Sequence, residues 1–311
     1  MPQTRIVLHP RHPYGIGDFL SSVPDIVLDR PSDDDGVAEA LQDGAEVLAT
    51  YTWREDFLSP SLRWVAGLGA GYEQYPIERL ADEGVVLTTA AGIHSAAVAE
   101  HAFALLLSLT RRIGESVRHM SEPRWVPLLG EELAGKKMAI IGLGRIGEAI
   151  ASRARNWEMM VAGSKRNPES YSGCVSDVRG PGDLGALCAW ADIVVLTTPA
   201  NADGTAVIGA RELELLGEGW LVNVGRGTLV DPDALLSAVT KGRLKGVALD
   251  VTSPEPLPED SPLWKSPKVV VSAHNAAASP NLAARWGKIF HQNLLAYHGR
   301  GSWKNRLTPM P

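Results

Sequence analysis

The stretch AIIGLGRIGEAIASRARNWEMMVAGSKRNP, residues 139–168, has the pattern of a strand, a glycine turn, a helix and a second strand. Its glycines match G-x-G-x-x-G, in which they permit a tight turn, a close approach of backbone to a pyrophosphate, and close packing of the helix on the strand. The helix N-terminus offers free N–H groups to the phosphates. The stretch therefore predicts a dinucleotide-binding turn, with a ligand-free glycine turn as the alternative. Its residues are Gly142, Gly144, Arg145, Ile146 and Gly147.

The end of the second strand carries the charge opposite to the usual one. Turns of this kind are followed about twenty residues on by an Asp or Glu that accepts hydrogen bonds from a ribose hydroxyl of NAD. Here Ser164, Lys165 and Arg166 stand in that place. An acid would repel a 2′-phosphate, whereas a hydroxyl and two cations can bind it. We therefore expect NADP(H) to be preferred over NAD(H); a solvated basic loop is the alternative.

The composition is that of an ordinary globular protein and excludes several classes. The chain has 311 residues, is 45% hydrophobic and carries a net charge of -6, which argues against a general nucleic-acid binder. The N-terminus lacks the apolar core of a signal peptide, and the most hydrophobic segment, AFALLLSL, is too short to cross a bilayer. Cys174 and Cys188 lack a metal-ligand pattern, so we expect reduced thiols, no metal site and a cytoplasmic protein.

Two series of short apolar runs alternate with helical segments, which predicts α/β architecture with parallel sheets. The first series comprises residues 5–8, 45–50, 63–67 and 85–89. The second comprises residues 137–142, 159–163, 193–198, 220–224, 246–251 and 268–273. Right-handed crossovers between such strands give doubly wound sheets.

Two long helices are expected at the joints between the domains. Residues 95–112 are apolar nearly all round, which predicts a helix buried on most faces, and Ser95 suits its N-cap. Residues 281–299 predict a second helix near the C-terminus, whereas 114–135 look irregular. We place the dinucleotide-binding domain at 95–280 and the other domain at 1–94 plus 281–311.

Three reactive side chains follow three successive strands of the second series. Arg226 follows the strand at 220–224, Glu255 follows 246–251, and His274 follows 268–273. Ligands of open parallel sheets bind beyond the carboxyl ends of the strands, so these residues share an edge with the glycine turn. An Arg can hold a carboxylate, a His can deliver a proton, and a carboxylate beside the His favours imidazolium. Each residue alone could instead be structural or a surface residue.

At this point the chain resembles the D-isomer-specific 2-hydroxyacid dehydrogenases over nearly its whole length. The motifs that carry the resemblance are GLGAGYEQYP (67–76), AAVAEHAFALLLSLTRR (96–112), WVPLLGEELAGKKMAIIGLGRIG (125–147), VVLTTPANADGT (194–205), LVNVGRGTLVDPDAL (221–235), LDVTSPEPLPEDSPLW (249–264) and SAHNAAAS (272–279). The resemblance implies two Rossmann-like doubly wound domains with the active site in the cleft between them, the first being the substrate domain. It also implies a homodimer, with the Trp125 segment at the interface.

The resemblance also implies roles for individual residues. Arg226 would bind substrate, His274 would be the acid/base, and Glu255 would pair with His274. Further residues would bind substrate through backbone amides (Ala70, Gly71), line the cofactor (Thr198, Pro199, Gly225) or hold the nicotinamide carboxamide (Asp250). The sequence departs from the family pattern at Tyr72-Glu73, at Gly225 and at Asn275, which leaves the shape of the substrate pocket open.

The expected activity is reduction of a small 2-keto acid, such as glyoxylate or hydroxypyruvate, to the D-2-hydroxy acid by hydride transfer from NADPH. The partners expected are therefore this small molecule and a second copy of the chain, with neither nucleic acid nor membrane. Two alternatives stay open. One is a dinucleotide-binding corepressor or scaffold of the same fold; the other is a formate- or phosphite-type dehydrogenase, which the basic Ser164–Arg166 segment disfavours.

Overall fold

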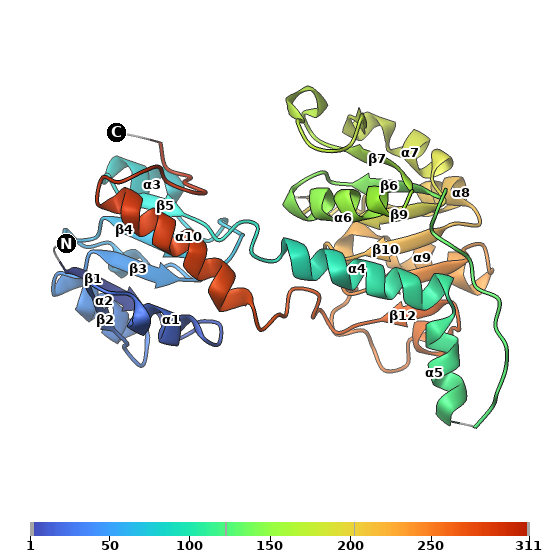
Figure 1. Cartoon of the computed structure of the whole chain (residues 1–311), viewed down its shortest axis with the longest axis horizontal. Helices are drawn as coiled ribbons and strands as arrows, with labels where there is room; N and C mark the ends of the chain where they lie inside the picture. The colour runs from blue at the N-terminus through green and yellow to red at the C-terminus, as the bar shows by residue number, and fades with distance from the viewer. Residues whose placement is uncertain (1–2, 122, 202, 310–311) are drawn as a thin grey trace. The chain divides into compact units, whose positions relative to one another are not determined.

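The computed structural model describes residues 3–121, 123–201 and 203–309. The chain divides into two compact units, which Figure 1 shows in the colours of the chain order. Unit 1 is made of residues 1–93 and 279–311, and unit 2 of residues 94–278. The C-terminal segment therefore returns to the unit that contains the N-terminus.

Unit 2 is built on a parallel sheet. Within the described residues it has seven strands in the order β12-β11-β10-β9-β6-β7-β8, and all neighbouring pairs are parallel. The strands are β6 (Lys137–Ile141), β7 (Met160–Ser164), β8 (Asp177–Arg179), β9 (Ile193–Leu196), β10 (Trp220–Asn223), β11 (Gly246–Leu249) and β12 (Val269–Val271). The chain runs outward from β6 to β8 and then returns to β9 on the other side of β6. The strand order therefore reverses between β6 and β9, which is where doubly wound sheets bind ligands.

Helices cover both faces of this sheet because alternate strand residues are apolar on each side. One core packs α4 (Ser95–Thr110) and α6 (Arg145–Asn156) against residues such as Ile140 and Val222. The other packs α7 (Leu184–Trp190), α8 (Ala210–Leu216) and α9 (Pro232–Thr240) against residues such as Ala139 and Leu221. Figure 1 shows α4 and α6 side by side on their face. The remaining elements are α5 (Ile113–Ser121) and the short 3₁₀ turns Pro168–Ser170, Pro181–Asp183, Gly227–Leu229 and Pro262–Lys265.

Unit 1 is a smaller doubly wound domain. Its five described strands are parallel in the order β2-β1-β3-β4-β5. They are β1 (Thr4–Leu8), β2 (Ile26–Asp29), β3 (Val47–Thr50), β4 (Trp64–Gly67) and β5 (Val86–Thr88). One face is covered by α1 (Ile16–Ser22) and α10 (Leu282–Tyr297); the other is covered by α2 (Asp34–Gln42), the 3₁₀ turn Glu55–Phe57 and α3 (Ile77–Asp82).

The C-terminal helix completes the core of unit 1. Phe290 of α10 stacks on Trp64 of β4 with ring centroids 5.0 Å apart, and on Trp286 at 4.7 Å. The indole N–H of Trp286 donates to the carbonyl of Gly67 at 3.2 Å. These contacts explain why α10 packs onto a sheet formed almost 200 residues earlier in the chain.

Each strand that the sequence predicts is present in the structure, with ends that differ by one or two residues in either direction. It missed β2 and β8, and it described the residues of α5 as irregular. The prediction of Ser95 as N-cap was wrong: the cap is His94, and the buried Ser95 hydroxyl has no hydrogen-bond partner. No described helix combines the length and apolarity that a membrane crossing requires.

Candidate active site

A groove of about 700 Å³ lies at the carboxyl ends of β6 and β9, where the strand order of unit 2 reverses. Its position follows from the topology, because the loops that leave β6 and β9 must run to opposite sides of the sheet. The groove is lined by Ile141, Gly142, Leu143, Gly144, Ser164, Lys165, Arg166, Asn167, Ser170, Pro181, Leu184, Thr197, Thr198, Pro199, Asn201, Ala206 and Val207. The glycine turn, the Ser164–Arg166 segment and the Thr198-Pro199 pair thus come together at one groove.

The three glycines of the turn meet three different constraints. Gly142 has φ of +107°, and a Cβ there would lie 2.8 Å from the amide nitrogen of Thr198. A Cβ at Gly147 would collide with the carbonyl oxygen of Gly142. At Gly144 a Cβ would meet no described atom within 4 Å, so the space next to it belongs to the groove. This combination fits a dinucleotide whose pyrophosphate approaches the backbone at Gly144.

The turn is held by neighbouring strands. Thr197 donates its hydroxyl to the carbonyl of Gly142 at 2.7 Å. The amide of Leu143 donates to the carbonyl of Ser164 at 2.8 Å. Sequence reasoning missed Thr197, although its place beside Thr198 after an apolar strand was a usable signal. It also missed Asn167 and Ser170, which extend the groove lining beyond the three predicted residues.

The rim of the groove beyond β7 is cationic. We call Ser164, Lys165 and Arg166 the basic lip. Ser164 is buried at the end of β7, Lys165 is half-buried, and Arg166 is exposed. The ammonium of Lys165 lies 3.5 Å from the carbonyl of Leu143 and 5.6 Å from the centroid of the Tyr171 ring. The lip is therefore anchored to the glycine turn on one side and to the loop after β7 on the other.

A histidine and a carboxylate meet beyond the neighbouring strands of the same sheet. The Nδ1 of His274 lies 2.6 Å from Oε1 of Glu255, and both side chains are about half exposed, at 48% and 42%. A carboxylate at this distance accepts the Nδ1 proton, orients the ring and leaves Nε2 for a substrate. Arg226 is exposed on the loop after β10, and its Nη1 donates to the carbonyl of Gly225 at 2.8 Å. Its side chain is thus turned back on its own loop.

The loop that carries His274 is held by hydrogen bonds to the buried carboxylate of Asp250. Asp250 is 2% exposed and follows β11. Its carboxylate accepts the hydroxyl of Ser272 at 2.6 Å and the amides of Asn275 and Ala276 at 3.1 and 3.0 Å. These bonds, with the amide of His274 donating to the Asp250 carbonyl at 2.8 Å, hold His274 at φ of +50°. The structure therefore gives Asp250 the task of shaping this loop.

A histidine that sequence reasoning did not single out adds to this network. The Nε2 of His101, on α4, lies 2.8 Å from the Ser272 hydroxyl and 3.3 Å from the Asp250 carboxylate. Helix α4 thereby joins the network behind the His274 loop. No sequence signal marked His101, because its partners are about 150 to 170 residues away along the chain.

Backbone crowding also sets the position of Arg226. A Cβ at Gly227 would collide with the carbonyl of Thr252, so the loops after β10 and β11 touch directly. A Cβ at Gly225 would lie 2.9 Å from the carbonyl of Thr198. The departure from the family pattern at Gly225 therefore accompanies close packing of its loop on the loop after β9.

The predicted substrate residues of unit 1 lie on the loop after β4. Ala70 and Gly71 are exposed, and in the described parts of the chain their amides donate to no protein acceptor. The next amide, of Tyr72, donates to the carboxylate of Glu73 at 2.9 Å. Two free amides in an exposed loop can bind an anion, but the neighbouring Glu73 carboxylate opposes this electrostatically.

Comparison with known proteins gives the family. Residues 103–276 match the family described as "D-isomer specific 2-hydroxyacid dehydrogenase, NAD binding domain". The chain belongs to the D-isomer specific 2-hydroxyacid dehydrogenases. It is 30% identical to a glyoxylate reductase of Korarchaeum cryptofilum, over 88% of this chain and 82% of the relative. It is 34% identical to glyoxylate/hydroxypyruvate reductase B of Pectobacterium atrosepticum, over 78% of each chain.

Solved structures agree with this assignment. The NADPH-dependent glyoxylate/hydroxypyruvate reductase of Sinorhizobium meliloti in complex with citrate aligns with a TM-score of 0.79 and 28% identity, over 99% of each chain. The same enzyme in complex with NADP and malonate aligns with a TM-score of 0.76. The chain is thus a dehydrogenase of this family with two α/β domains. These relatives do not favour the corepressor or the formate-type alternative.

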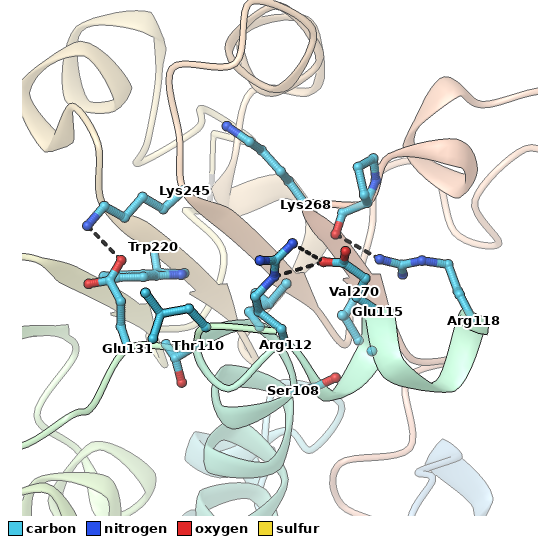
Figure 2. A pocket seen from close by; sticks show the side chains of 14 residues that line it. Ser108, Thr110, Arg112, Glu115, Arg118, Glu131, Trp220, Lys245, Lys268 and Val270 are labelled. Carbon is cyan, nitrogen blue, oxygen red and sulfur yellow. Dashed lines mark hydrogen bonds and ion pairs between the residues drawn. The ribbon is translucent and has the colours of Figure 1, made fainter. Parts of the chain in front are cut away.

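This dehydrogenase has a second hollow, of about 420 Å³, at the amino-terminal edge of the unit 2 sheet (Figure 2). Three of its cationic side chains already have partners in the protein. Arg112 pairs with Glu115, Lys245 pairs with Glu131, and Arg118 donates to the carbonyl of Pro267. Trp220 begins β10, so the hollow opens at the strand ends opposite those that carry the candidate catalytic residues. We therefore place the chemistry at the carboxyl edge and not here.

Two alanine substitutions separate the role of the groove from that of the turn. Gly144→Ala meets no protein atom, so thermal stability should not change, but the methyl group enters the groove and should raise the Kd for NADPH at least about tenfold. Gly147→Ala collides with the Gly142 carbonyl and should lower the free energy of unfolding by about 1–3 kcal/mol. Calorimetry and thermal unfolding measure both. If Gly144→Ala binds NADPH as tightly as the wild type does, the placement of the pyrophosphate at Gly144 is contradicted.

Proposed function

We propose that this enzyme reduces a small 2-keto acid, such as glyoxylate or hydroxypyruvate, to the D-2-hydroxy acid with NADPH. The observation that carries the proposal is the contact between His274 and Glu255, at the same sheet edge as the dinucleotide groove. Its relatives support the substrate class, because several are named glyoxylate or glyoxylate/hydroxypyruvate reductases.

Each residue of the carboxyl edge has a chemical task in this proposal. When bound, NADPH supplies the hydride. Protonated His274 gives its Nε2 proton to the substrate oxygen, and Glu255 stabilises the imidazolium and fixes the ring. Arg226 leaves the Gly225 carbonyl and holds the substrate carboxylate, since a guanidinium binds a carboxylate more strongly than a neutral carbonyl. The amides of Ala70 and Gly71 are the candidate carboxylate ligands of unit 1.

The dinucleotide would be held by the groove residues of unit 2. The turn from Gly142 to Gly147, with Arg145 and Ile146 at the start of α6, receives the pyrophosphate. Thr198, Pro199 and Gly225 would line the nicotinamide half of the cofactor, and Asp250 orders the loop of His274. The basic lip receives the 2′-phosphate, which supports NADPH over NADH; the Sinorhizobium meliloti relative named above was crystallised with NADP.

We expect kcat/KM with NADPH to exceed that with NADH in the reduction of glyoxylate or hydroxypyruvate. The double variant Lys165→Asp/Arg166→Ala should reverse this order, because the aspartate repels the 2′-phosphate and accepts from the ribose instead. Rates with both cofactors and a panel of glyoxylate, hydroxypyruvate, pyruvate and branched 2-keto acids measure this. A wild-type preference for NADH would contradict the assignment of the basic lip. Inactivity on every keto acid would contradict the proposed reaction.

Glu255→Gln should lower kcat of reduction by roughly tenfold, because a neutral amide holds the Nδ1 proton and the orientation of the His274 ring less firmly than the carboxylate does. His274→Ala should lose roughly 100-fold or more in kcat in both directions while NADPH binding stays near wild type. Steady-state rates and calorimetry with NADPH measure both variants. An unchanged kcat in Glu255→Gln would count against the pairing as a catalytic feature.

An exposed apolar segment in unit 2 supports a homodimer. Helix α5 has no buried residue among those described and extends away from its sheet (Figure 1). On it and just after it, large apolar side chains are uncovered: Ile113, Val117, Met120, Trp125, Val126 and Leu129. Trp125 is 98% and Leu129 91% exposed. A group of large apolar side chains exposed together usually marks a surface that another molecule covers. A second copy of the chain is the proposed cover.

The double variant Trp125→Asp/Leu129→Asp should therefore be a monomer at concentrations where the wild type is a dimer. Charged side chains at these positions resist burial at an interface. Light scattering after size exclusion measures the mass. The double variant Tyr14→Asp/Tyr72→Asp, which also replaces exposed aromatic residues, is the control and should stay dimeric. A monomeric wild type would contradict the proposal.

The thiols fit a reducing compartment. Cys174 and Cys188 are free, and burial raises the pKa of both, that of Cys188 to about 12. They therefore stay protonated and unreactive. We propose a cytoplasmic location, which cell fractionation would test.

A further inference from the structure

An acidic side chain lies next to the basic lip. Glu148 stands in the first turn of α6, one residue after the glycine turn, and is half-buried. Its negative charge and the positive charge of Lys165 act on each other across the rim of the groove. An unengaged acid here would do what the usual acid after the second strand does: bind the cation or the ribose and disfavour a 2′-phosphate.

Both oxygens of Glu148 are, however, engaged by the loop after β7. The hydroxyl of Tyr171 donates to Oε2, and the amide of Cys174 donates to Oε1 at 2.7 Å. Burial works against ionisation of Glu148, but these two bonds and the nearby Lys165 outweigh it and hold the pKa of the carboxyl below its usual value. Glu148 is thus an anion, and each of its oxygens already accepts a hydrogen bond from a donor other than Lys165.

The loop is shaped to keep this contact. A Cβ at Gly173 would collide with both the Tyr171 hydroxyl and the Glu148 carboxylate, so the backbone closes directly over the pair. The Tyr171 oxygen also accepts the amide of Val175 at 3.1 Å. Burial and the Glu148 carboxylate raise the pKa of Tyr171 to about 12, so its hydroxyl keeps the proton that it donates.

Lys165 lies over the ring of the same tyrosine. Its ammonium is 5.6 Å from the Tyr171 ring centroid and donates to the carbonyl of Leu143 at 3.5 Å. A ring face and one long hydrogen bond leave an ammonium with donors to spare. Lys165 therefore keeps its charge available at the rim although a carboxylate is near.

We propose that Tyr171 is a positioning residue for cofactor specificity: its hydroxyl keeps Glu148 away from Lys165, so that the ammonium stays free for the 2′-phosphate of NADPH. The inference rests on the proposed use of NADPH. Removing the hydroxyl frees Oε2 of Glu148, which then pairs with Lys165 and competes with the phosphate. Tyr171 acts through Glu148 and Lys165, and it is not among the residues that line the groove.

Tyr171→Phe tests this, because it keeps the ring over Lys165 and removes only the donor. Calorimetry with adenosine 2′,5′-bisphosphate and with AMP separates the 2′-phosphate from the rest of the nucleotide. The variant should bind the bisphosphate about fivefold more weakly and AMP as the wild type does. In steady state, KM for NADPH should rise by the same factor, with kcat and the NADH constants unchanged.

Removing the acid should restore binding. Tyr171→Phe/Glu148→Gln should recover wild-type affinity for the bisphosphate, and Glu148→Gln alone should bind it at least as tightly as the wild type. In a Lys165→Met background, Tyr171→Phe should have no further effect on bisphosphate affinity. This set discriminates against a purely structural role, in which Tyr171→Phe would weaken both nucleotides and Glu148→Gln would rescue neither. Circular dichroism checks that each variant folds.

The outcomes that overturn the inference are distinct from those that overturn the function. Unchanged bisphosphate affinity in Tyr171→Phe, or no rescue by Glu148→Gln, overturns the role of Tyr171 while the wild-type preference for NADPH stands. If Tyr171→Phe does not fold, weaker bisphosphate binding by Glu148→Gln alone overturns it. A wild-type enzyme that binds AMP and the bisphosphate equally and prefers NADH overturns the basic lip and this inference together.

Discussion

The approach of backbone to backbone at the carboxyl edge of the unit 2 sheet is the constraint on which the rest depends. Gly142 lies against the amide of Thr198, Gly147 against the carbonyl of Gly142, and Gly227 against the carbonyl of Thr252. At each place a side chain would force the loops apart. Because glycine occupies these positions, the loops after β6, β9, β10 and β11 converge, and their side chains share one edge.

Polar tethers turn that convergence into a site. The carboxylate of Asp250 accepts hydrogen bonds from Ser272, Asn275 and Ala276 and thereby fixes the conformation of the His274 loop. Glu255, on the loop after β11, contacts His274. The Thr197 hydroxyl does the same for the glycine turn. Buried polar groups that are fully hydrogen-bonded can specify one arrangement of a loop, which hydrophobic packing alone does less well. The contact between His274 and Glu255 thus depends on a second carboxylate, that of Asp250, which shapes the loop of His274 without contacting its ring.

The positive charge that the nucleotide groove offers to a ligand depends on the hydrogen bonds of the nearby carboxylate as well as on the number of cations. Lys165 of the basic lip acts electrostatically on Glu148, whose two oxygens accept from Tyr171 and Cys174. The hydrogen bonds that engage an acid can therefore matter as much as the acid itself. The same reasoning applies to the second hollow, where cations are numerous but are already bound to carboxylates or carbonyls.

The sequence by itself determined the fold class, the order of the main strands, the glycine turn and the family, because these follow from local periodicity and short motifs. It missed β2 and β8, which are short strands at the sheet edges with no fully buried residue. It missed α5, although Ile113, Val117 and Met120 recur at helical spacing along it, because the helix is short and has Gly114 in its first turn. It named Glu255 and His274 by their strands and the family motif.

Tertiary structure alone decided the contacts between side chains that are far apart in the sequence. The 2.6 Å contact between Glu255 and His274 is one of them. The contacts of Tyr171 with Glu148, His101 with Ser272 and Thr197 with Gly142 are others. The energy of a hydrogen bond depends on the distance between its atoms in space, which local sequence patterns do not encode.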